Sequence, residues 1–187
     1  MNDVGAPVFY ETERLRARGF TDDDVEAFVG YRADPDVARY QSWSDYTLEQ
    51  GRALVAFMQR SAPGTPGEWY QLALEPRTGG PIVGDLALHV DAEEPRLAEV
   101  GFTLAPAAQG QGYAAEALTG LLGWAFPTLG LHRVVAVTDA LNAPAAALLE
   151  RVGFRREAHH VENVFFKGAW GSEYQFALLA REWAARR

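Results

Sequence analysis

The stretch from residue 69 to residue 139 limits the possible fold more than any other part of the sequence. Three strand-like runs, over 69–74, 82–90 and 97–104, are joined by turns too short for a crossover, so they predict an antiparallel meander. A helical pattern over 114–126 and a β-branched run, "HRVVAVTDA", follow directly. A meander that continues through a helix into a buried strand indicates a mixed α/β domain.

The flanking segments complete this pattern with a sheet of about seven strands and four helices in one domain, residues 1–187. Thr21 is the expected N-cap of the first helix, and Thr47 with Gln50 forms a capping box for the second. The expected elements outside the central stretch are a strand over 8–18, helices over 21–34, 48–58 and 144–152, and strands over 155–166 and 173–179.

Composition narrows the class of protein. The chain has 187 residues, of which 48% are hydrophobic, enough for the core of one domain. We expect a cytoplasmic protein with no membrane partner, because no signal sequence is visible and no apolar run approaches the roughly 18 residues of a membrane span. The absence of cysteine removes disulfides, thiolate metal ligands and cysteine nucleophiles. A net charge of −8 argues against nucleic-acid binding and mildly favours a cationic partner.

Two glycines stand immediately before the helix that begins near residue 114, in the sequence "QGQGYAAEA". Glycine costs backbone entropy, so it is typical of unusual turns and of close approach to a ligand. A helix N-terminus offers unpaired N–H groups and the positive end of the helix dipole. The stretch therefore indicates an anion site, although an ordinary loop before an ordinary helix also explains these glycines.

Two phosphate-binding motifs fit this stretch poorly. A P-loop requires Lys at the position of Tyr113. A dinucleotide fingerprint is matched by Gly110, Gly112 and Ala115, and an acid, Asp139, follows the next strand. However, "APAAQ" separates the glycines from the preceding strand, and too few residues remain after Asp139 for a doubly wound sheet.

The stretch resembles the acetyl-coenzyme A loop of the GNAT superfamily of N-acetyltransferases, in which Gln or Arg is followed at fixed spacing by Gly and by Gly or Ala. Gln109, Gly112 and Ala114 match that motif. Further segments resemble, in order, the subgroup that includes the ribosomal-protein N-terminal acetyltransferases. These segments are "TERLRARGFTDDDVEAF", "EVGFTLAP", "NAPAAALLERVGFRRE" and "GAWGSEYQFALLAREW".

This resemblance implies a fold, a co-substrate and a binding site. The fourth and fifth strands are expected to run parallel and to splay apart, with the pantetheine arm of acetyl-CoA in the gap and its pyrophosphate on the N–H groups of the glycine-rich loop. Asn142 is expected to contact the arm, although a helix N-cap explains it equally well. The implied cofactor-binding residues are Phe102, Thr103, Leu104, Gln109, Gly110, Gln111, Gly112, Tyr113, Ala114 and Asn142.

Acetyl transfer to an amine requires a base, and Glu99, on the strand before the loop, is our candidate. A solvated or salt-bridged carboxylate is the alternative reading. Asp85 and His89 share one face of the neighbouring strand and could act through water, but a turn-side acid and a structural histidine explain them as well. Leu149 stands where many relatives carry the Tyr that protonates the departing thiolate. A thiol with a pKa near 8.5 needs little such help.

The acceptor is expected to be a primary amine. The resemblance implies that the first two helices wall its pocket, so Tyr40 and Trp43, together with Asp85, are the candidate substrate-binding residues; core packing is their alternative role. His159 and His160 are expected to point to opposite faces of the sheet, and we predict no metal site. A protein N-terminal amine ranks first and a small cationic amine, of aminoglycoside or polyamine type, second. A non-catalytic acyl-CoA-binding domain is the other alternative, and we expect a monomer or homodimer.

Overall fold

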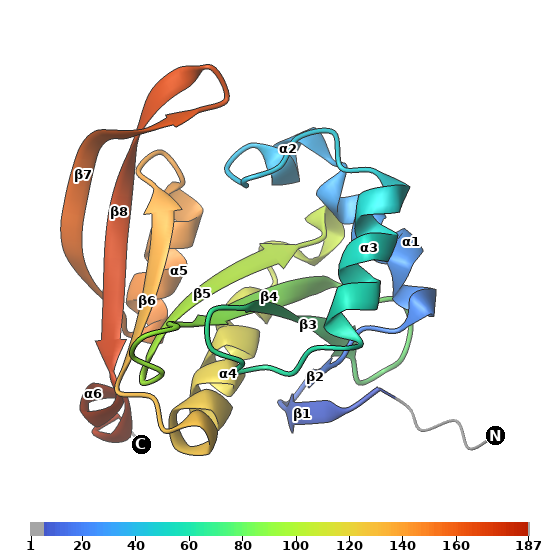
Figure 1. Ribbon diagram of the computed structural model, residues 1–187, viewed down its shortest axis with the longest axis horizontal. Coiled ribbons are helices and arrows are strands. Elements are labelled where there is room, and N and C mark those ends of the chain that lie inside the picture. Colours follow the sequence, from blue (N-terminus) through green and yellow to red (C-terminus); the bar gives the residue numbers. More distant parts are fainter. Residues whose placement is uncertain (1–5, 187) are drawn as a thin grey trace.

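One sheet of eight strands organises the computed structural model, which describes residues 6–186 (Figure 1). The strand order is β1-β2-β3-β4-β5-β6-β8-β7, and neighbours run antiparallel except for the parallel pair β5 and β6. The predicted meander is confirmed as β3, β4 and β5. The strands are β1 (Val8–Glu11), β2 (Leu15–Arg18), β3 (Trp69–Pro76), β4 (Gly84–Val90), β5 (Leu97–Leu104), β6 (Arg133–Asp139), β7 (Arg155–Phe166) and β8 (Ala169–Leu179).

Helices cover both faces of this sheet (Figure 1). Helices α1 and α3 pack on each other over one face, while α4 packs on α5 and against β1, β2 and β5 on the other. Within residues 6–186, every helix is too short or too polar to cross a bilayer. The helices are α1 (Val25–Arg32), α2 (Pro35–Ala38), α3 (Leu48–Met58), α4 (Tyr113–Leu129), α5 (Ala143–Val152) and α6 (Ala180–Ala184).

The prediction of one strand over 8–18 is wrong, because this segment folds back as the hairpin β1–β2. The backbone N–H of Thr12 donates to the carbonyl of Leu15 at 2.8 Å and closes the turn. Residues 11–14 are four consecutive polar residues, which break the alternation, but they include neither Gly nor Pro to mark a turn. The extra strand raises the count from about seven to eight. Helices α2 and α6 were not predicted because four or five residues are too few to show helical periodicity.

Among the other elements, two boundaries differ most from the predictions. The helix predicted over 21–34 begins as a 3₁₀ turn at Asp22–Asp24 and ends at Arg32. Strand β8 begins at Ala169, inside the segment predicted to be the turn before it. The predicted capping box of α3 is confirmed: the N–H of Gln50 donates to Oγ1 of Thr47 at 3.2 Å, and the N–H of Thr47 donates to Oε1 of Gln50 at 2.8 Å.

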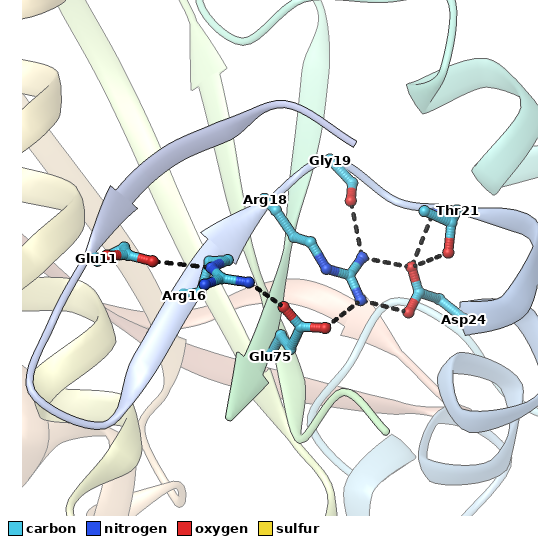
Figure 2. A network of polar contacts seen from close by, with 7 residues as sticks. All are labelled: Glu11, Arg16, Arg18, Gly19, Thr21, Asp24 and Glu75. Atoms are coloured by element: carbon cyan, nitrogen blue, oxygen red, sulfur yellow. Dashed lines mark hydrogen bonds and ion pairs between the residues drawn. The ribbon is translucent and has the colours of Figure 1, made fainter. Parts of the chain in front are cut away.

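A network of charged side chains fastens the first hairpin to the start of α1 (Figure 2). Arg18, on β2, donates to both carboxylate oxygens of Asp24 at 2.7 and 2.9 Å, and Asp24 also accepts the N–H of Thr21 at 2.7 Å. Burial alone raises the pKa of Asp24, but the hydrogen bonds from Arg18 and Thr21 outweigh it and lower that pKa. Asp24 therefore ties the first helix to the sheet and reciprocates the predicted N-cap, Thr21.

Candidate active site

The parallel strands β5 and β6 separate partway along their length. Pairing covers only residues 97–99 of β5, opposite residues 133–135 of β6, although β5 continues to Leu104 and β6 to Asp139. A cavity of about 150 Å³ occupies the gap and meets a second cavity of about 480 Å³ that reaches the glycine-rich loop. A larger hollow of about 880 Å³, bordered by β1, α4 and α6, contains none of the predicted site residues. Five residues line both of the joined cavities: Tyr40, Gln41, Phe102, Asn142 and Ala145.

The glycine-rich loop adopts backbone dihedral angles that residues other than glycine rarely adopt. Gly110 has φ 72° and Gly112 has φ 81°, both in the left-handed region that favours glycine. Gly112 is the N-cap of α4, and the first intrahelical bond runs from the N–H of Glu116 to its carbonyl at 3.1 Å. The N–H groups that precede that of Glu116, in the loop and in the first turn of α4, therefore have no helical partner, as at any helix start. Gln109 and Gly110 line the cavity of about 480 Å³, whereas Gln111 is exposed. An arginine guanidinium lies over the ring of Tyr113.

That arginine is Arg14, for which no local sequence pattern indicates a place at the loop. Its guanidinium donates to Oε2 of Glu116 at 2.6 Å and to the carbonyl of Gln111 at 3.0 Å, and it lies 4.3 Å from the ring centroid of Tyr113. Because this cation is already paired with Glu116, it adds hydrogen-bond donors rather than net positive charge to the anion site at the helix N-terminus. Arg14 stands 97 positions before Gln111, so no local pattern connects the two.

The predicted arm-binding residues lie along the cavities with unequal access. Phe102, Thr103 and Leu104 all line the cavity that reaches the loop, beyond the last pairing of β5 with β6; Thr103 is 6% and Leu104 9% exposed, and Phe102 is less buried than either. The side chain of Gln109 donates to the carbonyl of Leu104 at 3.1 Å and so joins the loop to the end of β5. Oδ1 of Asn142 accepts the N–H of Ala145 at 3.3 Å, so Asn142 is a helix N-cap and also borders both cavities.

Leu149 is 1% exposed and lines the smaller cavity, and Ala114 lines the larger one. An aliphatic side chain at 149 offers no proton to a departing thiolate. His159 lies against the ring of Tyr174, and His160 approaches the side chain of Gln175 on the opposite face of β8. The two histidines therefore do point apart.

Glu99 lies at the last residue of β5 that pairs with β6, where the two strands begin to separate. Within the described part of the chain, no hydrogen bond or ion pair engages its half-buried carboxylate. Burial is the main reason that the pKa of Glu99 is raised, and the nearby charge of Glu173 adds to the rise. His89, which lies on β4 and pairs with Glu99, opposes the rise. A half-buried carboxylate without a structural partner is typical of a functional group.

The structure places Asp85 in the core. This carboxylate is 1% exposed, and it accepts hydrogen bonds from the hydroxyl of Tyr31 at 2.6 Å and from the guanidinium of Arg32 at 2.9 Å. The prediction that Asp85 binds substrate is therefore not supported, because both oxygens are occupied and closed off from the cavities. Trp43 packs over the same guanidinium at 4.1 Å and donates its indole N–H to the carbonyl of Arg32 at 3.0 Å.

Two segments that are far apart in the sequence wall the smaller cavity. Tyr40 and Gln41, which follow α2, form one side, and Val164, Phe166 and Glu173 of the β7–β8 hairpin form another. The tip of that hairpin bends toward α2 above the sheet (Figure 1). Of the three predicted substrate-binding residues, Tyr40 alone borders the cavities. Trp43 does not line them, and its hydrogen bond to Arg32 holds this segment to the end of α1.

Known proteins share this architecture. A family model described as "Acetyltransferase (GNAT) domain" matches residues 14–155. The solved structure of an acetyltransferase (GNAT family) from Bacillus anthracis is 28% identical, covers 93% of this chain and 99% of its own, and has a TM-score of 0.84.

Two further solved structures have different acceptors in their names. A putative ribosomal-protein-serine acetyltransferase from Vibrio cholerae is 25% identical over 94% of this chain and 99% of its own, with a TM-score of 0.74. A spermidine N-acetyltransferase from Vibrio cholerae, solved in complex with CoA and spermine, is 21% identical over 91% of this chain and 98% of its own, with a TM-score of 0.78. The fold is thus common to proteins named for a protein acceptor and for a polyamine.

Proposed function

Because the chain belongs to the acetyltransferase (GNAT) family, it is an acyltransferase that uses acetyl-CoA, and we propose that it acetylates a primary amine, with a protein N-terminal amine as the acceptor. The observation that carries this proposal is the pair of adjacent cavities that share five lining residues and extend from the glycine-rich loop to the gap between β5 and β6, where Val100, the residue after Glu99, is part of the lining. The cavities thus extend from an anion-binding helix start toward the part of β5 that carries Glu99, a carboxylate without a structural partner among the described residues.

The chain's own residues fit the co-substrate. Bound acetyl-CoA supplies the acetyl thioester that is the acyl donor. Gly110 has no atom within 4 Å of the position of an added Cβ, so the loop leaves open space on its outer side. The N–H groups of Gln111 to Ala114 and the guanidinium of Arg14 are the groups we propose for the pyrophosphate. The edge of β5 at Phe102 and Leu104, with which β6 does not pair, is the one we propose for the pantetheine amides, with Asn142 beside it.

Glu99 is the group that we propose to take the proton from the acceptor ammonium, directly or through a water molecule. Its raised pKa suits this role, since a base whose pKa is closer to the working pH is more effective. The attacking nitrogen must be neutral. The carboxylate of Glu99, which lies where β5 and β6 begin to separate, is the group that we propose to remove its proton. Leu149 offers no proton to the thiolate, so we propose that solvent supplies it.

A small cationic amine is the second candidate acceptor. The carboxylates of Asp139 and Glu173 both border the smaller cavity, and they favour a substrate with more than one positive charge. A panel of peptides with free and blocked N-termini, beside spermidine and an aminoglycoside, separates the candidates by thiol release from acetyl-CoA. We expect turnover only with free N-termini. Turnover confined to the small amines would place them first, and CoA binding without turnover of any amine would indicate a binding domain.

The loop gives a prediction about cofactor affinity. Gly112→Val is expected to raise the KM for acetyl-CoA by about tenfold or more, since a loss of 1.4 kcal/mol in binding is already a tenfold change. A branched side chain at φ 81° strains the N-cap of α4 and occupies space beside the N–H groups of the loop. Gly79→Val is the matched control, because Gly79 has φ 84° in the turn after β3 and lies outside the cavities. Equal KM values for both variants and the parent would contradict the proposed loop contact.

A further inference from the structure

The turn of the β7–β8 hairpin carries Lys167, which is the only lysine in the sequence beside sixteen arginines. Its ammonium group donates to the carbonyl of Ala38 and, at 2.8 Å, to the carbonyl of Trp43. The first of these carbonyls belongs to the last residue of α2. One side chain thus fastens the C-terminal hairpin to the segment that follows α2, 129 positions earlier in the sequence. We call this contact the Lys167 clasp.

The backbone at this turn is unusual for its sequence. Lys167 has φ 49° and Gly168 has φ 86°, so both residues of the two-residue turn are left-handed. Such turns favour Asn, Asp or Gly at the first position, and lysine is a poor choice there. A residue that is held in a disfavoured conformation by its contacts is a reason to look for function.

The clasp joins the two walls of the smaller cavity. The carbonyls that it grips, at residues 38 and 43, bracket Tyr40 and Gln41, which form one wall. Phe166, directly before Lys167, belongs to the opposite wall. The hydroxyl of Tyr40 also donates to the carbonyl of Leu141 at 3.4 Å, which is a long contact. That contact holds Tyr40 to the segment after β6, so among the described residues the hydrogen bonds between the two walls themselves are those of Lys167.

We propose that Lys167 is a specificity-determining residue, because the clasp fixes the width of the acceptor cavity and so favours amines whose neighbouring groups are slender. This inference rests on the proposed function as an amine acetyltransferase. A cavity of about 150 Å³ is about the size that holds one benzene ring, so an amine with a few attached carbons fits within it, whereas an amine that also carries an aromatic or branched group fills it and requires its walls to separate. Bulky acceptors react only when the clasp opens and the hairpin moves away from the segment after α2.

The test compares kcat/KM for two peptide acceptors that differ only in the N-terminal residue, Ala or Phe, and for two small amines, a linear diamine and benzylamine. Lys167→Met keeps the length of the side chain and removes the charge. We expect it to raise the ratio of bulky to slender kcat/KM on the order of tenfold, which is the discrimination that small changes in a pocket provide. Lys167→Arg, which can still donate to both carbonyls, is expected to keep the ratio of the parent.

The control variant is Arg60→Met, which removes an exposed cation just after α3 and should leave the ratio unchanged. An unchanged ratio in Lys167→Met, with the parent active, overturns the specificity role and leaves the proposed function standing. A parent enzyme that acetylates none of the four amines counts against the proposed function instead, and the clasp is then judged by a measurement that needs no turnover.

That measurement is the rate at which an amine-selective acylating reagent labels Lys167, followed by peptide mass spectrometry. With a single lysine in the chain, the signal belongs to one side chain. An ammonium held by two carbonyls reacts slowly, because the neutral amine must first leave the clasp. We expect labelling of the folded protein to be at least about tenfold slower than labelling in urea, which corresponds to 1.4 kcal/mol. Equal rates in the folded and unfolded chains overturn the clasp.

Discussion

Replacing Asp85 with Asn is expected to lower the free energy of unfolding by about 3–5 kcal/mol, the usual cost of removing one partner from a buried ion pair. The side chains of Asp85 and Arg32 are 2% and 5% exposed, and their charged groups lie 2.9 Å apart. The guanidinium is surrounded by the rings of Phe28, Trp43 and Tyr46 and has no other carboxylate partner among the described residues. An amide at position 85 keeps the shape of the side chain but leaves that cation buried without a counter-charge.

Thermal unfolding measures this effect. For a domain of this size, 1 kcal/mol corresponds to roughly 2–4 °C, so the melting temperature should fall by roughly 6–20 °C. Asp36→Asn is the matched control, since Asp36 also pairs with an arginine but its side chain is 87% exposed, and such pairs contribute little. The double variant Asp85→Asn with Arg32→Met is expected to recover part of the loss. If Asp85→Asn is no more damaging than the control, the ion pair does not stabilise the core.

The same variant also decides the role of Asp85. The helix α1, which carries Tyr31 and Arg32, leads directly into α2 and the segment with Tyr40. If Asp85 acts only as an anchor, turnover per folded molecule stays close to that of the parent below the melting transition. A loss of kcat without a loss of stability would instead return Asp85 to the substrate-binding residues.

Local patterns explain which parts of the fold and site were predictable. The meander, the capping box at Thr47 and the glycine-rich loop each depend on residues that are close in the sequence, and each is present. The loop was predictable as an unusual turn because glycine is the only residue that adopts positive φ at little cost. Helical periodicity likewise located α3, α4 and α5 to within a few residues.

Contacts between distant segments explain what the sequence could not show. Asp85 was expected to face an amine because nothing near it reveals Arg32, which lies 53 positions earlier. Arg14 reaches the loop and Lys167 reaches α2 in the same way, through the packing of the whole domain. Trp43 was predicted as part of the acceptor wall, yet it packs on Arg32, because aromatic side chains are used for cores and for pockets alike.

Glu99→Gln is expected to lower kcat by about 10²- to 10⁴-fold, the usual contribution of a general base. The amide keeps the shape of the side chain and removes the proton acceptor. Affinity for acetyl-CoA should change little, because Glu99 does not line the cavity that reaches the glycine-rich loop. The loss should shrink at high pH, where the acceptor amine is already neutral in solution.

The stability of Glu99→Gln provides an independent test of the role of Glu99. The direction of the expected change in the free energy of unfolding follows from the raised pKa of Glu99. Between the ordinary pKa of glutamate and the raised value, the folded state binds the proton more tightly than the unfolded state does. The free energy of unfolding therefore falls as the pH rises through this window and stays reduced above it. Gln carries no such penalty, so at neutral pH the variant should be as stable as the parent or more stable. A carboxylate that served the fold would give the reverse: lower stability with normal turnover.

The pH–rate profile then identifies the group that titrates. With Glu99 as the base, kcat of the parent rises with pH as the carboxyl loses its proton, and this acidic arm disappears in Glu99→Gln. Glu173→Gln is the matched control, because it removes a second carboxylate near the gap without removing the base. Since the charge of Glu173 helps to raise the pKa of Glu99, this control should keep the acidic arm and move it to lower pH. An acidic arm that survives in Glu99→Gln and moves in Glu173→Gln would assign the titration to a group other than Glu99.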